Sequence, residues 1–179
     1  KSQIPEAGIL HGKVIDYITG KSNSLPNLFN EREKQHLADV RNLVKNFNIA
    51  IYVFLVLFVL MLVLFGLLLK EEPHIIGFVG KTLAYGGILA IIISIVFLLL
   101  AMFNFTSAFG SFHKLFFQQG TYTFNPENEL IVRLYPEELF RDLGIKIMKT
   151  VLMVSFIIVI FGFILLLTSQ TKKNKKISR

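Results

Sequence analysis

Two histidines, His36 and His113, are the residues of this sequence best suited to acid/base chemistry. His36 lies 13 residues before the uncharged run 49–69, and His113 lies 10 residues after the uncharged run 82–103. Two consecutive membrane spans return a chain to the side from which it started, so both imidazoles should face one aqueous compartment at comparable height. Because an imidazole changes charge near neutral pH, the pair predicts proton transfer on a lipid-like substrate at a membrane surface.

A carboxylate accompanies the first histidine. Asp39 follows His36 by three residues on a predicted helix, which places the two side chains on one face. The carboxylate would orient and charge the imidazole for proton transfer. The alternative is an ordinary solvated helix face with no chemistry. His113, by contrast, lies among phenylalanines, where it is either a buried neutral base or an interfacial ring without a chemical role.

Arg133 is the candidate for binding charge. It lies between Val132 and Leu134 and would anchor a phosphate, a carboxylate or an oxyanion. The alternative is a structural salt bridge to a nearby acid, for which the candidates are Glu127, Glu129 and Asp142.

Other catalytic chemistries have weaker support in the sequence. His36, Asp39 and His113 would also suit a metal site of the two-histidine, one-carboxylate type, but no His-Glu-x-x-His pattern occurs. No Gly-x-Ser-x-Gly pattern supports a serine hydrolase. The absence of cysteine excludes a thiol nucleophile, thiolate ligands and disulfides.

The elements that position these residues are membrane helices. Of the 179 residues 53% are hydrophobic, 18 are phenylalanine, and the mean hydropathy is +0.59, which is too apolar for a soluble domain of this size. Three runs of 20 to 22 residues, 49–69, 82–103 and 150–169, contain no Asp, Glu, Lys, Arg or His. Each is long enough to cross the hydrocarbon core as a helix. Since such unbroken runs lack the alternation of barrel strands, the sequence predicts an all-α polytopic membrane protein.

Charge gives the orientation. Five of the 19 basic residues lie in the last nine positions, which is typical of a cytoplasmic tail. The basic residues before the first run oppose this assignment. The chain begins with Lys1, and we expect a fourth, N-terminal membrane helix or a cleaved signal to precede it.

The predicted organisation alternates cap and membrane segments. A small extracytoplasmic α/β cap is expected from two parts of the chain. The segments are 1–45 (cap, first part), 46–69 (transmembrane), 70–75 (cytoplasmic turn), 76–104 (transmembrane), 105–144 (cap, second part), 145–169 (transmembrane) and 170–179 (basic cytoplasmic tail).

Within the cap, local patterns predict four elements. Residues 9–18 favour a short amphipathic helix, and Asn30 with Glu33 forms a capping box at the start of a second helix. Two β-rich runs, 121–124 and 130–134, flank an Asn-Pro turn and indicate a hairpin. Pro136 should open a helix that leads into the last span.

Three motifs together resemble a known family. They are Glu31-Arg32-Glu33 with His36-Leu37-x-Asp39-Val40, then Phe112-His113-x-Leu115-Phe116-Phe117, then Leu130-Ile131-x-Arg133-Leu134-x-Pro136. In order and spacing, from about residue 29 to 142, they are similar to the membrane family that contains the bacterial lipoprotein intramolecular transacylase. In the hairpin region that family has an acidic residue and a tryptophan where this chain has Asn128 and Tyr122.

The resemblance implies a four-helix membrane protein with an extracytoplasmic cap, and we expect it to lie in the plasma membrane and to need no cofactor or metal. Its activity would be acyl transfer in a diacylglyceryl lipoprotein, or a similar membrane lipid, from the glyceryl sn-2 oxygen to the amine of the N-terminal cysteine. It implies that His36 and His113 are the acid/base pair, with Asp39 holding His36. Arg133 would stabilise charge or anchor substrate, and acyl chains would lie against Phe109, Phe112 and Phe116.

Two other functions remain open from the sequence. One is a non-enzymatic membrane subunit or scaffold that binds a partner protein through its cap, which would tolerate loss of both histidines. The other is a metal-dependent lipid hydrolase. The sequence leaves open which histidine is the acid, and also the oligomeric state.

Overall fold

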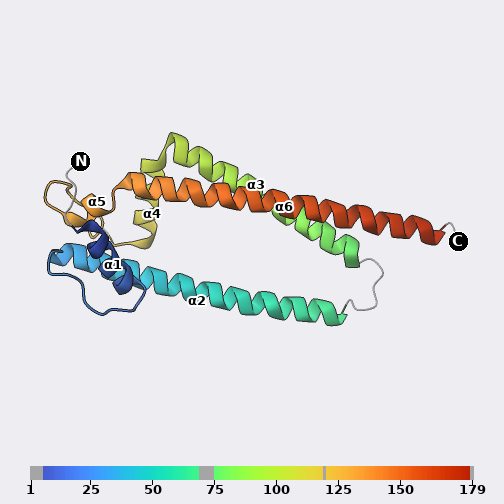
Figure 1. Cartoon of the computed structure of the whole chain (residues 1–179), viewed down its shortest axis with the longest axis horizontal. Coiled ribbons are helices and arrows are strands. Elements are labelled where there is room, and N and C mark those ends of the chain that lie inside the picture. The colour runs from blue at the N-terminus through green and yellow to red at the C-terminus, as the bar shows by residue number, and fades with distance from the viewer. Residues whose placement is uncertain (1–5, 69–74, 119, 178–179) are drawn as a thin grey trace. The chain divides into compact units, whose positions relative to one another are not determined.

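The computed structural model describes residues 6–68, 75–118 and 120–177, with side chains as far as Thr171. In these residues there are six helices and no strand (Figure 1). They are α1 (Ala7–Ile18), α2 (Glu31–Leu68), α3 (Ile75–Phe103), α4 (Phe105–Phe116), α5 (Leu130–Leu134) and α6 (Glu137–Ile177). Three of them, α2, α3 and α6, are long and apolar enough to cross a membrane. The all-α fold predicted from the apolar runs is therefore confirmed.

The structure forms two compact units. Of the described residues, those within 1–59 and 106–140 form one unit, and those within 60–105 and 141–179 form the other. The predicted cytoplasmic turn 70–75 lies outside the described residues except for Ile75, which begins α3. The side chains of the basic tail from Lys172 onward also lie outside them.

The first unit has a small apolar core. Val14 of α1, Phe29 before α2, Leu37 of α2 and Ile131 of α5 are buried against one another. Arg41 ties α1 to α2, because its guanidinium lies 4.9 Å from the ring centre of Tyr17 and donates a 2.9 Å hydrogen bond to Asn23. Helix α1 matches the predicted segment 9–18 closely and supports the N-terminal end of α2.

The capping box at the start of α2 is present as predicted. Asn30 Oδ1 accepts a 2.9 Å hydrogen bond from the backbone N–H of Glu33, and Glu33 Oε2 accepts a 2.7 Å bond from that of Asn30. These bonds satisfy N–H groups that a helix N-terminus leaves without partners. Helix α2 then runs without interruption from the cap into its apolar segment.

The predicted β-hairpin, and with it the α/β cap, is wrong. Residues 130–134 form the helix α5, and residues 121–129 contain no strand. Glu33 Oε1 accepts a 2.8 Å hydrogen bond from the backbone N–H of Ile131 and so caps α5 from another helix. The buried Ile131 also contributes to the core. These long-range contacts outweigh the β-propensity of the Leu-Ile-Val run.

In the second unit α3 and α6 pack antiparallel through small residues. A methyl group at Gly80 would lie 2.8 Å from the carbonyl oxygen of Gly162, and one at Gly87 would lie 3.2 Å from that of Ser155. Ser155 hydrogen-bonds the carbonyl oxygen of Val151, 2.7 Å away on its own helix. Small residues let the backbones approach closely, which is how membrane helices associate when lipid supplies no hydrophobic driving force.

Candidate active site in the cap

The two histidines meet in the first unit. His36 lies on the second turn of α2 and His113 on the last turn of α4. Their ring centres are 6.1 Å apart and their planes are 19° from parallel. The two histidines are 77 residues apart in the sequence, and the fold brings them together as the sequence predicted.

Aromatic rings surround both imidazoles. Phe117 contacts both of them, with its ring centre 4.8 Å from that of His36 and 5.3 Å from that of His113. Phe124 approaches His36 edge-on at 5.4 Å. Phe109, Phe112 and Tyr122 contact His113 at 4.3, 5.7 and 5.4 Å. The histidines therefore lie in an apolar environment, where electrostatic interactions are stronger than in water.

The tautomer of neutral His113 is fixed by its own helix. Nδ1 lies 2.8 Å from the backbone oxygen of Phe109, one turn earlier. A carbonyl only accepts, so Nδ1 carries the proton and donates it. The neutral ring therefore has its lone pair on Nε2, which is the form needed by a base.

His36 is the more deeply buried of the two histidines. It retains 8% of its accessible surface, and no described residue provides a hydrogen-bond partner for its buried Nδ1. Burial, with a smaller contribution from the nearby His113, lowers the pKa of His36 to about 4. His36 precedes the apolar segment of α2, which begins after Lys45, so this shift concerns a residue outside that segment. At neutral pH the imidazole is uncharged.

Asp39 does not act on His36 in the way predicted. It lies one turn further along α2 and is partly buried. No hydrogen bond or ion pair joins these two described side chains, and Nδ1 of His36 remains without a partner. The three-residue spacing on α2 therefore does not produce a hydrogen bond between the two described side chains.

Comparison with known proteins identifies the family. The sequence model described as lipoprotein intramolecular transacylase Lit matches residues 9–140, which is most of the chain. The chain belongs to this family. No curated protein matches the sequence. Among solved structures, the membrane integral lipoprotein intramolecular transacylase Lit from Bacillus cereus is similar with a TM-score of 0.62 and 23% identity, covering 98% of this chain and 76% of that one.

The likeness to the Bacillus cereus structure shows a shared fold. Together with the family match and the three apolar helices, it supports a membrane location for this Lit-family chain. The family that the three sequence motifs suggested is therefore confirmed.

The predicted substrate-binding residues of this Lit-family member separate into two groups. Phe109 and Phe112 contact His113, and Phe116 contacts Phe112 at 4.8 Å and Phe47 at 5.9 Å. Arg133 is exposed on α5, and its side chain forms no ion pair with any described residue. Arg32 is the arginine that pairs with Glu129.

Sequence reasoning missed three site residues, which are Phe117, Tyr122 and Phe124. Phe117 could have been found, because it lies four residues after His113 as Phe109 lies four before it, and the helical period places such residues on one face. Tyr122 and Phe124 follow Gly120, which adopts a positive φ of 91°. Their approach to the histidines depends on the path of the chain after that turn, and no local pattern signals it.

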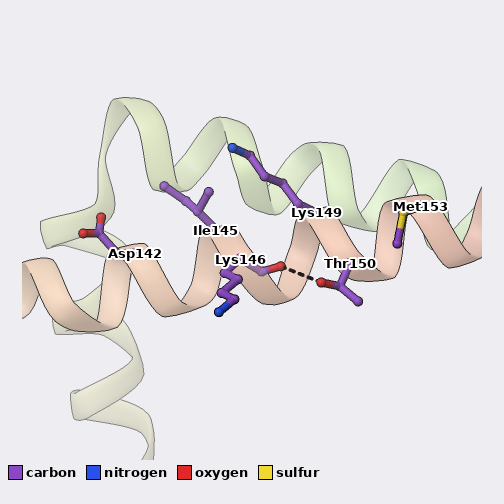
Figure 2. A pocket seen from close by; sticks show the side chains of 6 residues that line it. All are labelled: Asp142, Ile145, Lys146, Lys149, Thr150 and Met153. Carbon is purple, nitrogen blue, oxygen red and sulfur yellow. Dashed lines mark hydrogen bonds between the residues drawn. The ribbon is translucent and has the colours of Figure 1, made fainter.

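A separate groove lies on α6 in the other unit (Figure 2). Its volume is about 460 Å³, and its lining residues are Asp142, Ile145, Lys146, Lys149, Thr150 and Met153. The hydroxyl of Thr150 donates to the carbonyl oxygen of Lys146, 3.0 Å away, within the same helix (Figure 2). No predicted catalytic or substrate-binding residue lines this groove. Its lysines lie at the start of an apolar run, as is usual for side chains that extend toward lipid headgroups.

The described residues contain no group of three or more histidine, cysteine or acidic side chains arranged to hold a metal. His36, Asp39 and His113 therefore do not form the metal triad considered from the sequence.

Proposed function

We propose that this chain is a lipoprotein intramolecular transacylase. In the proposed reaction it moves an acyl chain of a diacylglyceryl lipoprotein from a glyceryl ester to the α-amino group of the N-terminal cysteine. The observation that carries the proposal is the pair of stacked histidines in an aromatic environment, in a chain that belongs to the Lit family. The proposed location of this cap is the outer side of the plasma membrane, where the charge of the C-terminal tail would place it.

The reaction needs a base for the amine. In our proposal Nε2 of His113 removes one proton from the amine as its nitrogen attacks the ester carbonyl carbon. The new C–N bond forms, the C–O bond to glycerol breaks, and the protonated His113 returns that proton to the glyceryl oxygen. The hydrogen bond from Nδ1 of His113 to the carbonyl of Phe109 supports this role, since it leaves Nε2 free to accept.

His36 has the complementary role. Nδ1 of His36 is buried without a described partner, so Nε2 is the nitrogen that remains for a substrate, and in our proposal the neutral ring carries its proton there. In our proposal this N–H stabilises the oxyanion that develops on the ester carbonyl oxygen. The low pKa of His36 supports a neutral donor and argues against a second base.

The remaining predicted residues have supporting roles in this proposal. Phe109, Phe112 and Phe116 form one continuous aromatic surface, which suits the apolar acyl chains. Arg133, exposed on α5, is available to anchor the polar part of the lipoprotein. Asp39 is expected to contribute least, because no hydrogen bond joins the described side chains of Asp39 and His36.

Mass spectrometry of a reporter lipoprotein tests the proposal. The N-terminal peptide would be analysed from cells that express the full-length protein, its His36→Ala variant or its His113→Ala variant. His11→Gln is a matched control, because His11 lies outside the aromatic cluster and hydrogen-bonds Tyr135. The proposal expects an N-acylated, single-O-acyl product that requires His36 and His113 but not His11. Absence of this product, with the protein present in the membrane, would contradict it.

A further inference from the structure

The Glu31-Arg32-Glu33 motif contains one residue whose contacts point toward the site. Arg32 binds the carboxylate of Glu129 in a bidentate manner, with Nη2 2.7 Å from both oxygens and Nε 3.1 Å from Oε1. Bidentate arginine–carboxylate pairs fix orientation as well as distance. The pair joins the first turn of α2 to a segment 97 residues later in the sequence.

Glu129 is itself held firmly. It retains 6% of its accessible surface, and Oε2 accepts a 2.6 Å hydrogen bond from the backbone N–H of Asn125. Burial alone would raise the pKa of Glu129, but this backbone bond and the Arg32 guanidinium outweigh it and lower the pKa. Asn125 Oδ1 accepts a further bond from the backbone of Glu127. The 125–129 turn is thus built around an ionised carboxylate.

The same guanidinium contacts Phe124, one of the aromatic rings around His36. Its central carbon lies 5.2 Å from the ring centre of Phe124, in cation–π contact. The ring centre of Phe124 in turn lies 5.4 Å from that of His36, with the planes 67° apart in an edge-to-face arrangement. Arg32 therefore contacts both ends of the segment 124–129, and Phe124 is the part of that segment that contacts His36.

We propose that Arg32 is a positioning residue: its clamp on Glu129 holds Phe124 against His36 and keeps water away from that imidazole. The catalytic consequence rests on the proposed function, in which a neutral His36 donates a hydrogen bond. The exclusion of water from His36 does not rest on that function, because water that reaches the imidazole would change its pKa, which can be measured without any acyl transfer.

Charge alone is the competing explanation for any effect of Arg32. The other ionisable groups around His36 are His113 on α4, Tyr122 in the aromatic cluster, and Glu33 and Asp39 on α2. Removing the Glu129 carboxylate separates the two explanations. Loss of a nearby negative charge would lower the pKa of His36, whereas opening the clamp would hydrate the imidazole and raise it.

The test measures the pKa of His36 by NMR in the full-length protein carrying labelled histidine, in detergent micelles. The chain has only four histidines, and a His36→Gln variant assigns the signal. Arg32→Lys keeps the charge but loses the bidentate fork, and Glu129→Ala removes its acceptor. Lys34→Gln is the matched control, because Lys34 pairs with the exposed Glu31 in the same part of α2.

The proposal expects both clamp variants to raise the pKa of His36 from about 4 by about one unit or more, toward 6.5. The Lys34 control should leave it nearly unchanged. A further variant, Phe124→Leu, should raise it as well, because the ring is lost while the clamp remains. A pKa unchanged in Arg32→Lys, or lowered in Glu129→Ala, would overturn the proposal.

Acyl transfer measured on the same variants keeps the two proposals distinct. If the wild-type protein transfers no acyl chain but the pKa shifts appear, the proposed function fails and the positioning role stands. If transfer occurs and the shifts do not, the positioning role fails alone.

Discussion

Replacing Glu33 with alanine should lower the free energy of unfolding of the cap by about 2–4 kcal/mol. The buried backbone N–H of Ile131 would lose its acceptor, which costs about 1–3 kcal/mol. The reciprocal cap on the N–H of Asn30 would also be lost, at a cost of about 1 kcal/mol. Since one carboxylate joins the start of α2 to α5, the variant should loosen both helices together.

Glu31→Ala is the matched control for this prediction. Glu31 also lies in the first turn of α2, so both substitutions remove the same favourable interaction with the helix dipole. Its side chain is 90% exposed, and the one ion pair it makes with a described residue is to Lys34 at i+3. Such a pair contributes about 0.2–0.5 kcal/mol. The difference between the two variants therefore measures the buried contacts of Glu33.

Denaturation in micelles, followed by circular dichroism, would measure the two free energies, since the chain has no tryptophan for fluorescence. Amide hydrogen exchange in residues 130–134 would locate the loss. The account expects faster exchange there in Glu33→Ala than in Glu31→Ala. Equal stabilities in the two variants, within about 0.5 kcal/mol, with equal exchange in α5, would refute the reasoning.

Further predictions concern helix packing and two titrating side chains. Gly162→Ala should cost about 1–3 kcal/mol in thermal or chemical unfolding, because its Cβ would lie 2.7 Å from the backbone nitrogen of Ala84, whereas Gly86→Ala meets no atom within 4 Å and should be neutral or stabilising. The free energy of unfolding should fall as the pH drops from about 6.5 to about 4, because the folded state holds His36 neutral while the unfolded chain takes up a proton. The loss is at most about 3 kcal/mol after allowance for solvent screening. The free energy of unfolding of His36→Gln should depend less on pH over this range, and an equal dependence would contradict the prediction. Burial raises the pKa of Tyr135 to about 12, so ultraviolet titration should show a phenol that ionises there and is missing from Tyr135→Phe.

Much of the fold follows from local patterns. The apolar runs predicted the long helices, and the Asn30–Glu33 spacing predicted where α2 begins. These features depend on neighbours within one or two turns, which a sequence displays directly. The hairpin prediction failed because α5 is stabilised by Glu33, a residue almost one hundred positions away.

Part of the candidate site could likewise be predicted from the sequence, and part could not. Two consecutive spans predicted that His36 and His113 share one side of a membrane, and their rings do lie 6.1 Å apart. A salt bridge from Arg133 to Glu129 was one alternative from the sequence, but Glu129 pairs with Arg32, which is distant in sequence and close in space. The partner expected for His36, Asp39, is near in sequence, but no hydrogen bond joins the two described side chains. Side-chain partners across elements thus required the structure.

Acyl transfer by purified protein tests the central claim most directly. The full-length protein, His36→Gln, His113→Gln and the double variant would be compared in liposomes with a synthetic diacylglyceryl lipopeptide, after circular dichroism has established that all four fold. The account predicts that each single substitution lowers the transfer rate by about 100-fold or more, and that the double variant is little worse than either, because the two imidazoles act as one unit. A single variant that keeps a rate close to wild type would contradict it.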